Sequence, residues 1–196
     1  SKCKQISYGL DDKAEIQGLN MRFSEGQFLL DVRIGENVWK DVELGVPGIH
    51  NAENALAVIG VCLELNVSEK QIRSGLSSFK GVKRRFEYII KREDKVYIDD
   101  YAHHPTEINA LLSSIRLLYP NKKVLGIFQP HLFSRTRDFM DDFALSLEKL
   151  DQLVLLPIYP ARELPMEGIT SNVLLEKINH NFKQVLSPSD AVEYAA

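Results

Sequence analysis

The second half of the chain alternates strand-like and helix-like patterns, and this constrains the fold more than any other feature. From Phe86 on, short apolar runs alternate with segments whose apolar residues recur every three or four positions. The runs that predict strands are Val96–Ile98, Val124–Phe128 and Leu153–Leu156. One predicted helix begins at Pro105, and the next carries Phe139, Phe143, Leu147 and Leu150. Such alternation implies right-handed crossovers, so the sequence predicts an α/β domain with a mostly parallel sheet covered on both faces.

The first part of the chain follows different periods. Residues 16–44 alternate apolar and polar side chains around Gly35-Glu36-Asn37, which predicts a hairpin of half-buried strands. A helical period follows and indicates a helix that starts near Asn51. Ser68 then opens a capping box before a second helix. The predicted buried side of that helix consists of Ile72, Leu76 and Phe79.

The run Lys80–Arg84 interrupts the helical pattern, and we expect the domain boundary there. The predicted domains are residues 1–82 and residues 83–196. The chain has no initiator methionine and opens in the middle of a pattern, so we expect it to be part of a longer protein.

Composition excludes several classes of function. The net charge is −3, with 24 basic and 27 acidic residues, so no broad basic surface for nucleic acid is expected. There is no run of about 18 apolar residues that could span a membrane and no apolar core of a signal peptide. The two cysteines have no metal-binding spacing. We expect a soluble, cytoplasmic protein with small charged ligands, no nucleic-acid partner and no membrane partner.

Three polar clusters follow the three predicted strands of the second domain. They are Asp99–His104, Gln129–Arg135 and Tyr159–Glu163. Because the carboxyl ends of parallel strands share one edge of a sheet, where ligands bind in such folds, the clusters predict one site. The alternative is that loops between strands and helices are polar in any protein. For three clusters together we favour a site.

Several residues of the second domain are candidates for chemistry. Asp99 and Asp100 could hold a metal, accept hydrogen bonds from ribose hydroxyls, or cap the loop. His103 stands beside a predicted helix start, where the helix dipole disfavours a protonated imidazole. Arg135 stands four residues after His131, and its guanidinium could clamp a carboxylate, or could simply be a solvated charge.

In the first domain, Asn51 and Asn54 lie about one helical turn apart. Their amides offer both a donor and an acceptor and could read the edge of an adenine, although asparagine at a helix start is more often a cap. Lys83-Arg84-Arg85 offers three cations that could reach a polyphosphate, or that could be solvated.

Taken together, these motifs resemble those of the Mur ligase family, and within it the type that joins L-alanine to UDP-N-acetylmuramate. The matching stretches are Pro47–Ala57, Phe79–Glu87, Asp99–Ile108, Phe128–His131 and Ser134–Thr136. The resemblance implies a three-domain enzyme. In it, residues 1–82 form the carboxyl-terminal part of the central ATPase domain, and residues 83–196 form most of a Rossmann-like carboxyl-terminal domain.

The resemblance also implies a reaction. ATP phosphorylates a carboxylate of the sugar nucleotide, and the amine of L-alanine attacks the acyl phosphate, which releases ADP and phosphate. Asn51 and Asn54 would contact adenine, Arg85 the phosphates and Asp100 the ribose. In this family a basic residue often follows the histidine of the Gln-Pro-His motif, whereas this chain has Leu132, so no carboxylate contact is expected from that position.

In the same reaction, His103 and Arg135 would hold the amino-acid substrate, with His131 close by. No metal ligand is assigned within the chain. The Mg²⁺ that accompanies ATP is expected to be held by residues upstream of Ser1, together with the phosphate loop that these 196 residues lack. The chain also stops before the last strands expected of the family. We therefore expect the chain by itself to fold without turning over substrate.

Three other functions remain open from the sequence. One is the related ligase that attaches recovered peptides to the same sugar nucleotide; Ser134-Arg135-Thr136 favours the alanine type over it. Another is a metal-dependent hydrolase built on Asp99, Asp100, His103, His104 and His131. The third is a nucleotide-binding module without catalysis.

Overall fold

The structure is a computed structural model that describes residues 4–11, 13–24 and 27–195. The chain forms two compact units. The first consists of Ser1–Tyr101 with Ser113–Leu118, and the second of Ala102–Leu112 with Tyr119–Ala196. Helix α3 (Pro105–Leu118) contributes to both units. As predicted, this helix begins at Pro105, whose ring fixes a backbone angle suited to the first turn of a helix.

A four-stranded sheet forms the base of the first unit, with its strands in sequence order. The strands are β1 (Tyr8–Gly9), β2 (Ile16–Ser24), β3 (Gln27–Ile34) and β4 (Asn37–Leu44). The pair β1–β2 is parallel, and the pairs β2–β3 and β3–β4 are antiparallel. The predicted hairpin is confirmed as β3 and β4, which a tight turn with Gly35 at φ 58° connects.

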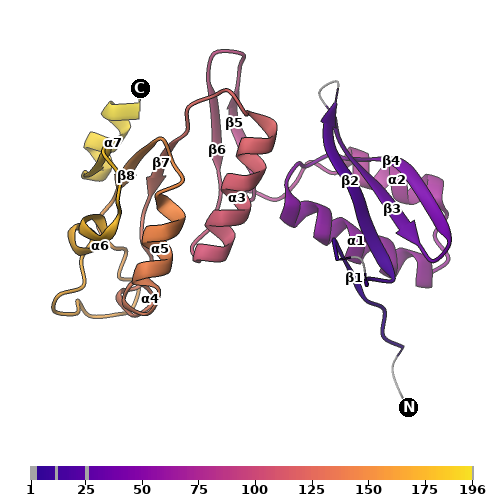
Figure 1. The fold of residues 1–196 in the computed structure, drawn as a ribbon, viewed down its shortest axis with the longest axis horizontal. Coiled ribbons are helices and arrows are strands. Elements are labelled where there is room, and N and C mark those ends of the chain that lie inside the picture. The colour runs from indigo at the N-terminus through magenta and orange to yellow at the C-terminus, as the bar shows by residue number, and fades with distance from the viewer. Residues whose placement is uncertain (1–3, 12, 25–26, 196) are drawn as a thin grey trace. The chain divides into compact units, whose positions relative to one another are not determined.

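Two helices follow the sheet, with α1 (Ile49–Glu64) beside β1 and β2, and α2 (Glu69–Ser78) beside β4 (Figure 1). The apolar residues of α1 that form the core recur every three or four positions: Ala52, Ala55, Leu56 and Ile59. The predicted capping box at Ser68 is confirmed. The prediction for Phe79 is wrong: α2 ends at Ser78, and Phe79 is 52% exposed.

Strands β5 (Glu87–Lys91) and β6 (Val96–Asp99) form an antiparallel hairpin in the first unit. The sequence predicts β6 as a member of the parallel sheet, but its backbone hydrogen bonds are with β5. The pattern around Phe86 gave no separate indication of β5, because its residues are only partly buried.

A parallel sheet forms the base of the second unit and confirms the predicted α/β class. Its order is β7–β8–β9, with β7 (Leu125–Phe128), β8 (Gln152–Leu155) and β9 (Lys183–Val185). Helices α4 (Phe133–Asp138) and α5 (Met140–Leu147) follow β7, α6 (Ser171–Lys177) follows β8, and α7 (Pro188–Ala195) follows β9.

The single helix predicted around Phe143 is two helices. The backbone at Phe139 (φ −116°, ψ 23°) leaves the helical region and separates α4 from α5. The predicted apolar period nevertheless marks the core, because Phe143, Leu147 and Leu150 are all buried. Leu150 lies beyond the end of α5.

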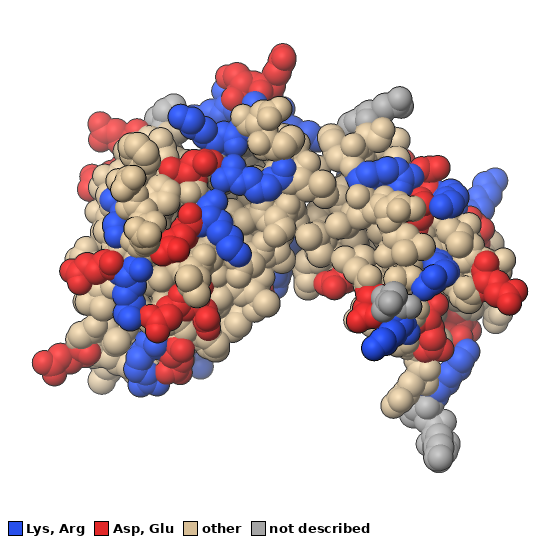
Figure 2. Space-filling model, in the orientation of Figure 1, with Lys and Arg blue, Asp and Glu red and all other residues tan. Residues whose placement is uncertain are grey.

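Acidic and basic side chains are intermingled on the face of the molecule that Figure 2 presents. None of the helices within the described ranges is both long enough and apolar enough to cross a membrane.

Candidate functional site

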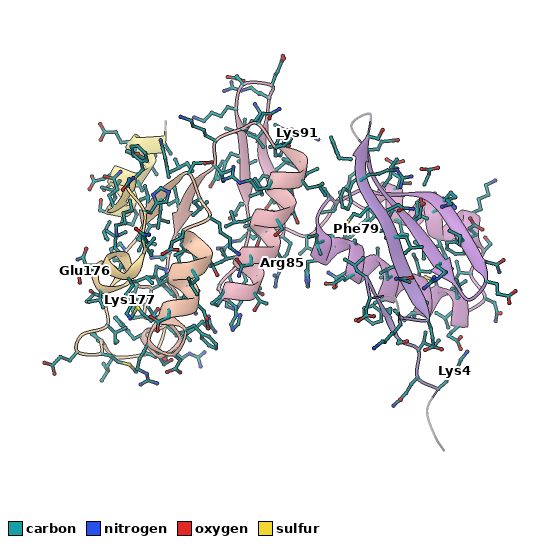
Figure 3. The ribbon with its side chains drawn as sticks, viewed as in Figure 1. Lys4, Phe79, Arg85, Lys91, Glu176 and Lys177 are labelled. Carbon is teal, nitrogen blue, oxygen red and sulfur yellow. The ribbon has the colours of Figure 1, made fainter. Side chains whose placement is uncertain are left out.

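The first unit contains a pocket of about 670 Å³ on the faces of α1 and α2 and on the segments that flank them. Asn51, Asn54 and Arg85, three residues expected to bind ATP, all line this pocket. Phe79 and Arg85, both labelled in Figure 3, belong to the segment that connects α2 to β5. The apolar part of the lining comes mainly from Leu44, Val46, Ala55, Val58, Val67, Ile72, Leu76, Phe79 and Val82. A largely apolar pocket with a few polar groups is typical of sites for small molecules.

The amino terminus of α1 shows that Asn51 does not cap this helix. The residue at the N-cap is Gly48, with φ 119° and ψ 148°, a conformation that favours glycine. The backbone N–H of Ile49 donates to Ser114 Oγ at 3.1 Å. The side chain of Asn51 donates from Nδ2 to the carbonyl of Pro47 at 2.8 Å. This bond orients the amide of Asn51, which lies about one turn before Asn54. Because the N-cap is Gly48 and no side chain caps the helix, the capping interpretation of the asparagines is wrong.

Arg85 lies in a segment that is folded tightly against the end of β6. Tyr101 donates its backbone N–H to the carbonyl of Arg84 at 2.8 Å. The guanidinium carbons of Arg84 and Arg85 lie 4.8 and 5.9 Å from the centroid of the Tyr101 ring. Arg84 and Phe86 both have positive φ angles, 58° and 51°, which are uncommon for residues other than glycine. Cation–π contact with Tyr101 therefore holds both guanidinium groups at a strained turn.

Asp100 helps to hold the same turn. Its Oδ2 accepts a hydrogen bond from the backbone N–H of Phe86 at 2.8 Å. The neighbouring Asp99 pairs with Arg84 Nε at 3.7 Å. A carboxylate can accept several hydrogen bonds, which is the chemistry that ribose hydroxyls require.

A second cluster, in the other unit, brings His131 and Arg135 together at the carboxyl ends of β7 and β8. The two loops join through an isolated bridge between His131 and Tyr159, and Leu132 donates its N–H to the Tyr159 carbonyl at 2.9 Å. The imidazole of His131 stacks on the Tyr159 ring with centroids 5.4 Å apart. Arg135 Nη1 lies 3.5 Å from His131 Nδ1, at the outer limit of a hydrogen bond. The predicted shared edge therefore holds for these two loops.

His131 sits in surroundings that oppose its protonation. Burial lowers the pKa of His131, and electrostatic interactions with Arg135 and His103 lower it further, while Glu163 acts in the opposite direction. Since its pKa is lowered from an ordinary value near 6.5, the surroundings favour the neutral form of His131 at pH 7. A neutral imidazole beside a guanidinium offers an acceptor and a cation to one ligand.

Glu107 orients His103 at the start of α3. The carboxylate accepts from the backbone N–H groups of His103 and His104, at 2.9 and 3.2 Å. His103 Nδ1 lies 3.3 Å from Glu107 Oε2. A proton on Nδ1 would therefore face Glu107 and leave Nε2 as an acceptor. The ring of His104 instead contacts Phe139, with centroids 4.5 Å apart, and its Nδ1 contacts Thr106 Oγ1 at 2.6 Å.

The sequence-predicted residues fall into two sets. Asn51, Asn54, Arg85 and Asp100 belong to the first unit, and His103, His131 and Arg135 to the second. Sequence reasoning gave no role to Glu107 or to Tyr101. Glu107 follows the histidines at the spacing of a half capping box, a signal that could have identified it. Within the described residues, no group of three or more His, Cys, Asp or Glu is arranged to hold a metal ion.

A parallel α/β sheet with polar loops at its carboxyl edge, and an apolar pocket with amide and guanidinium groups, are features of nucleotide-dependent α/β enzymes. Residues 84–196 match the family described as Mur ligase, glutamate ligase domain. The chain belongs to the Mur ligase family.

Individual relatives agree with this assignment. The chain is 47% identical over 189 residues to the UDP-N-acetylmuramate–L-alanine ligase of Flavobacterium psychrophilum. The aligned region covers 96% of this chain and 42% of that protein. The structure is similar to the UDP-N-acetylmuramate-alanine ligase MurC of Thermotoga maritima, with a TM-score of 0.78, 26% identity and coverage of 97% and 41%. A murein peptide ligase from Psychrobacter arcticus has a TM-score of 0.58, 26% identity and coverage of 96% and 39%. The chain spans about two-fifths of the length of these relatives.

Proposed function

We propose that this chain supplies nucleotide-binding and amino-acid-binding residues of an ATP-dependent ligase that joins L-alanine to UDP-N-acetylmuramate. The observation that carries the proposal is the pocket that gathers Asn51, Asn54 and Arg85. The 47% identity to an L-alanine ligase supports the choice of acceptor and amino acid over the peptide ligase of cell-wall recycling. Such a reaction belongs to peptidoglycan precursor synthesis in the cytoplasm, where ATP and the sugar nucleotide are available.

In the proposed nucleotide site, each residue acts through its ordinary chemistry. The amides of Asn51 and Asn54 donate to and accept from the edge of adenine, whose faces contact the apolar lining of the pocket. Arg85 neutralises phosphate charge. Asp100, whose carboxylate also accepts from the backbone N–H of Phe86, accepts hydrogen bonds from the ribose hydroxyls. Bound ATP supplies the phosphoryl group that activates the carboxylate.

In the proposed amino-acid site, Arg135 binds the carboxylate of L-alanine through two parallel hydrogen bonds. His103, held by Glu107, and the neutral His131 accept hydrogen bonds from its amine. An amine that is held in place without a proton is ready to attack an acyl phosphate, so the contribution of these residues is mainly positioning. The Mg²⁺ that accompanies ATP is assigned no ligand in this chain.

We further propose that residues 1–82 belong to a central ATPase domain and residues 83–196 to the carboxyl-terminal domain. The start of the family match at residue 84 supports this boundary. By itself the chain is expected to bind nucleotide weakly and to turn over no substrate, because it carries no phosphate loop.

Nucleotide binding tests the proposal directly. Titration of the ¹⁵N-labelled chain with ATP should shift the side-chain amide signals of Asn51 and Asn54. The matched control is Glu53→Gln, which should leave the shifts intact, whereas Asn54→Ala should weaken binding about tenfold. A titration that moves signals of the second unit but none around this pocket would contradict the assignment.

A further inference from the structure

Helix α4, which carries Arg135, begins without a cap of its own. Its N-cap residue is Leu132, which has no side-chain acceptor and adopts φ 73° and ψ 134°, a conformation that costs energy for a residue with a side chain. The first N–H groups of a helix have no partner within the helix and require an acceptor from elsewhere. Ser, Thr, Asp or Asn usually provides that acceptor at the N-cap.

Glu163 provides the missing cap from another loop. Its Oε2 accepts from the backbone N–H of Ser134 at 2.9 Å, and its Oε1 accepts the hydroxyl of Ser134 in a short hydrogen bond. The backbone N–H of Phe133 also interacts favourably with this carboxylate. Hydrogen bonds from the side chain and the backbone of Ser134 lower the pKa of Glu163, with smaller contributions from Phe133 and the charge of Arg135. The carboxylate is therefore ionised at neutral pH.

The loop after β8 is shaped to present this carboxylate. Glu163 donates its own N–H to the carbonyl of Pro160 at 2.9 Å, which closes a turn in which Ala161 has φ 49°. The same loop provides Tyr159, whose ring stacks on His131. One loop thus contacts both residues of the second cluster, His131 through Tyr159 and the helix of Arg135 through Glu163.

We propose that Glu163 is a positioning residue that sets the place of Arg135 and its contact with His131. The importance of the Arg135–His131 contact for the reaction rests on the proposed function. Because Glu163 occupies the first N–H groups of α4, a substrate carboxylate is directed to the guanidinium of Arg135 instead. The carboxylate also offsets the positive charges of Arg135 and Arg137, which both interact with it electrostatically.

Kinetics of the full-length ligase that contains this chain give the first test. Glu163→Ala should raise the KM for L-alanine about ten- to hundredfold and leave the KM for ATP unchanged. Glu163→Gln, which keeps an acceptor but loses the charge, should give a smaller rise. Glu167→Gln, a charge change in the same exposed loop, is the matched control and should behave as wild type. Equal changes in both KM values, or no difference from the control, would overturn the proposal.

Titration of His131 gives a test that does not require ligase activity. The charged groups that act on His131 are Arg135, His103 and Glu163. NMR titration of the 196-residue chain should therefore give a lower pKa for His131 in Glu163→Gln than in wild type, with no change in Glu167→Gln. An unchanged pKa in folded Glu163→Gln would overturn the proposed positioning. A lower pKa together with a ligase that ignores L-alanine would uphold the interaction of Glu163 with this cluster and reject the proposed function.

Discussion

At the scale of single residues, the second cluster depends on the planar geometry of one guanidinium. Arg135 lies 3.5 Å from His131 and is the third residue of a helix only six residues long. Binding a carboxylate through two parallel hydrogen bonds requires the fork of an arginine, which a lysine does not provide.

Arg135→Lys should therefore raise the KM for L-alanine about tenfold or more, although the charge is kept. Arg137→Lys, two residues along the same exposed helix, is the control, because Arg137 pairs with Asp138 at its surface. Steady-state kinetics of the full-length ligase measures both. Equal effects of the two substitutions would show that Arg135 is an ordinary surface charge.

Orientation of His103 by Glu107 leads to a second prediction. Glu107→Gln keeps the side-chain size but removes the charge that faces His103 Nδ1, so kcat should fall about tenfold or more at neutral pH while binding of ATP stays the same. Glu176→Gln, on α6, is a control in the same unit. An unchanged kcat in Glu107→Gln would contradict a role for this carboxylate in the reaction.

Asp31 is an acid of the first unit whose pKa is strongly lowered, and its side chain is 4% exposed. Burial by itself would raise its pKa, but hydrogen bonds from Asn20, the backbone of Asp41, Lys40 and Arg22 outweigh burial and hold the pKa well below its ordinary value. These bonds join β3 to irregular positions of β2 and β4.

Because the pKa of Asp31 is lower in the folded state, its contribution to stability is present above pH 4 to 5, roughly, and is lost as the pH falls below that. Asp31→Asn should lower the free energy of unfolding by about 2 kcal/mol at pH 7, and the difference from wild type should shrink toward pH 3. Urea unfolding at both pH values measures this, with Glu36→Gln in the hairpin turn as control. A difference that grows at low pH would contradict the assignment.

At the scale of elements, α1 and α2 form the pocket because their facing sides are small or branched apolar residues, with polar groups at one end. Cys62, the one free thiol found in the described part of the chain, lines the same pocket from α1. It can therefore report on occupancy.

In a Cys3→Ser background, ATP should slow alkylation of Cys62 by N-ethylmaleimide several-fold, because a bound base blocks access to the pocket. UTP at the same concentration is the control. Mass spectrometry after timed alkylation gives the rates. Protection of equal size by both nucleotides would indicate a pocket that does not select adenine.

Patterns in the sequence were sufficient to predict most elements, including the β3–β4 hairpin, the capping box of α2 and the parallel strands β7 and β8. It failed where tertiary contacts decide. The pairing of β6 with β5 depends on a partner with no clear pattern, and the break at Phe139 leaves the apolar period unchanged. The position of Asn51 near the start of α1 was predicted correctly. The N-cap at Gly48 was not predicted, because it depends on a backbone angle that the periodicity of the sequence does not encode.

At the scale of the whole molecule, the chain divides its candidate residues between two compact units. Nucleotide candidates lie in one unit and amino-acid candidates in the other, so the two binding properties should be separable by mutation. The contact of Glu163 with α4 was beyond the sequence because it depends on which loops meet in space, whereas the spacing of Glu107 from the histidines was a usable signal. The other candidate site residues were assigned from their resemblance to Mur ligase motifs.

The measurement that tests this account most directly is phosphate release by the full-length protein in the presence of ATP, UDP-N-acetylmuramate and L-alanine. We predict release that requires all three substrates, that is lost in Arg135→Ala, and that is absent from the 196-residue chain alone. Release that does not depend on L-alanine, or release by the isolated chain, would contradict the account.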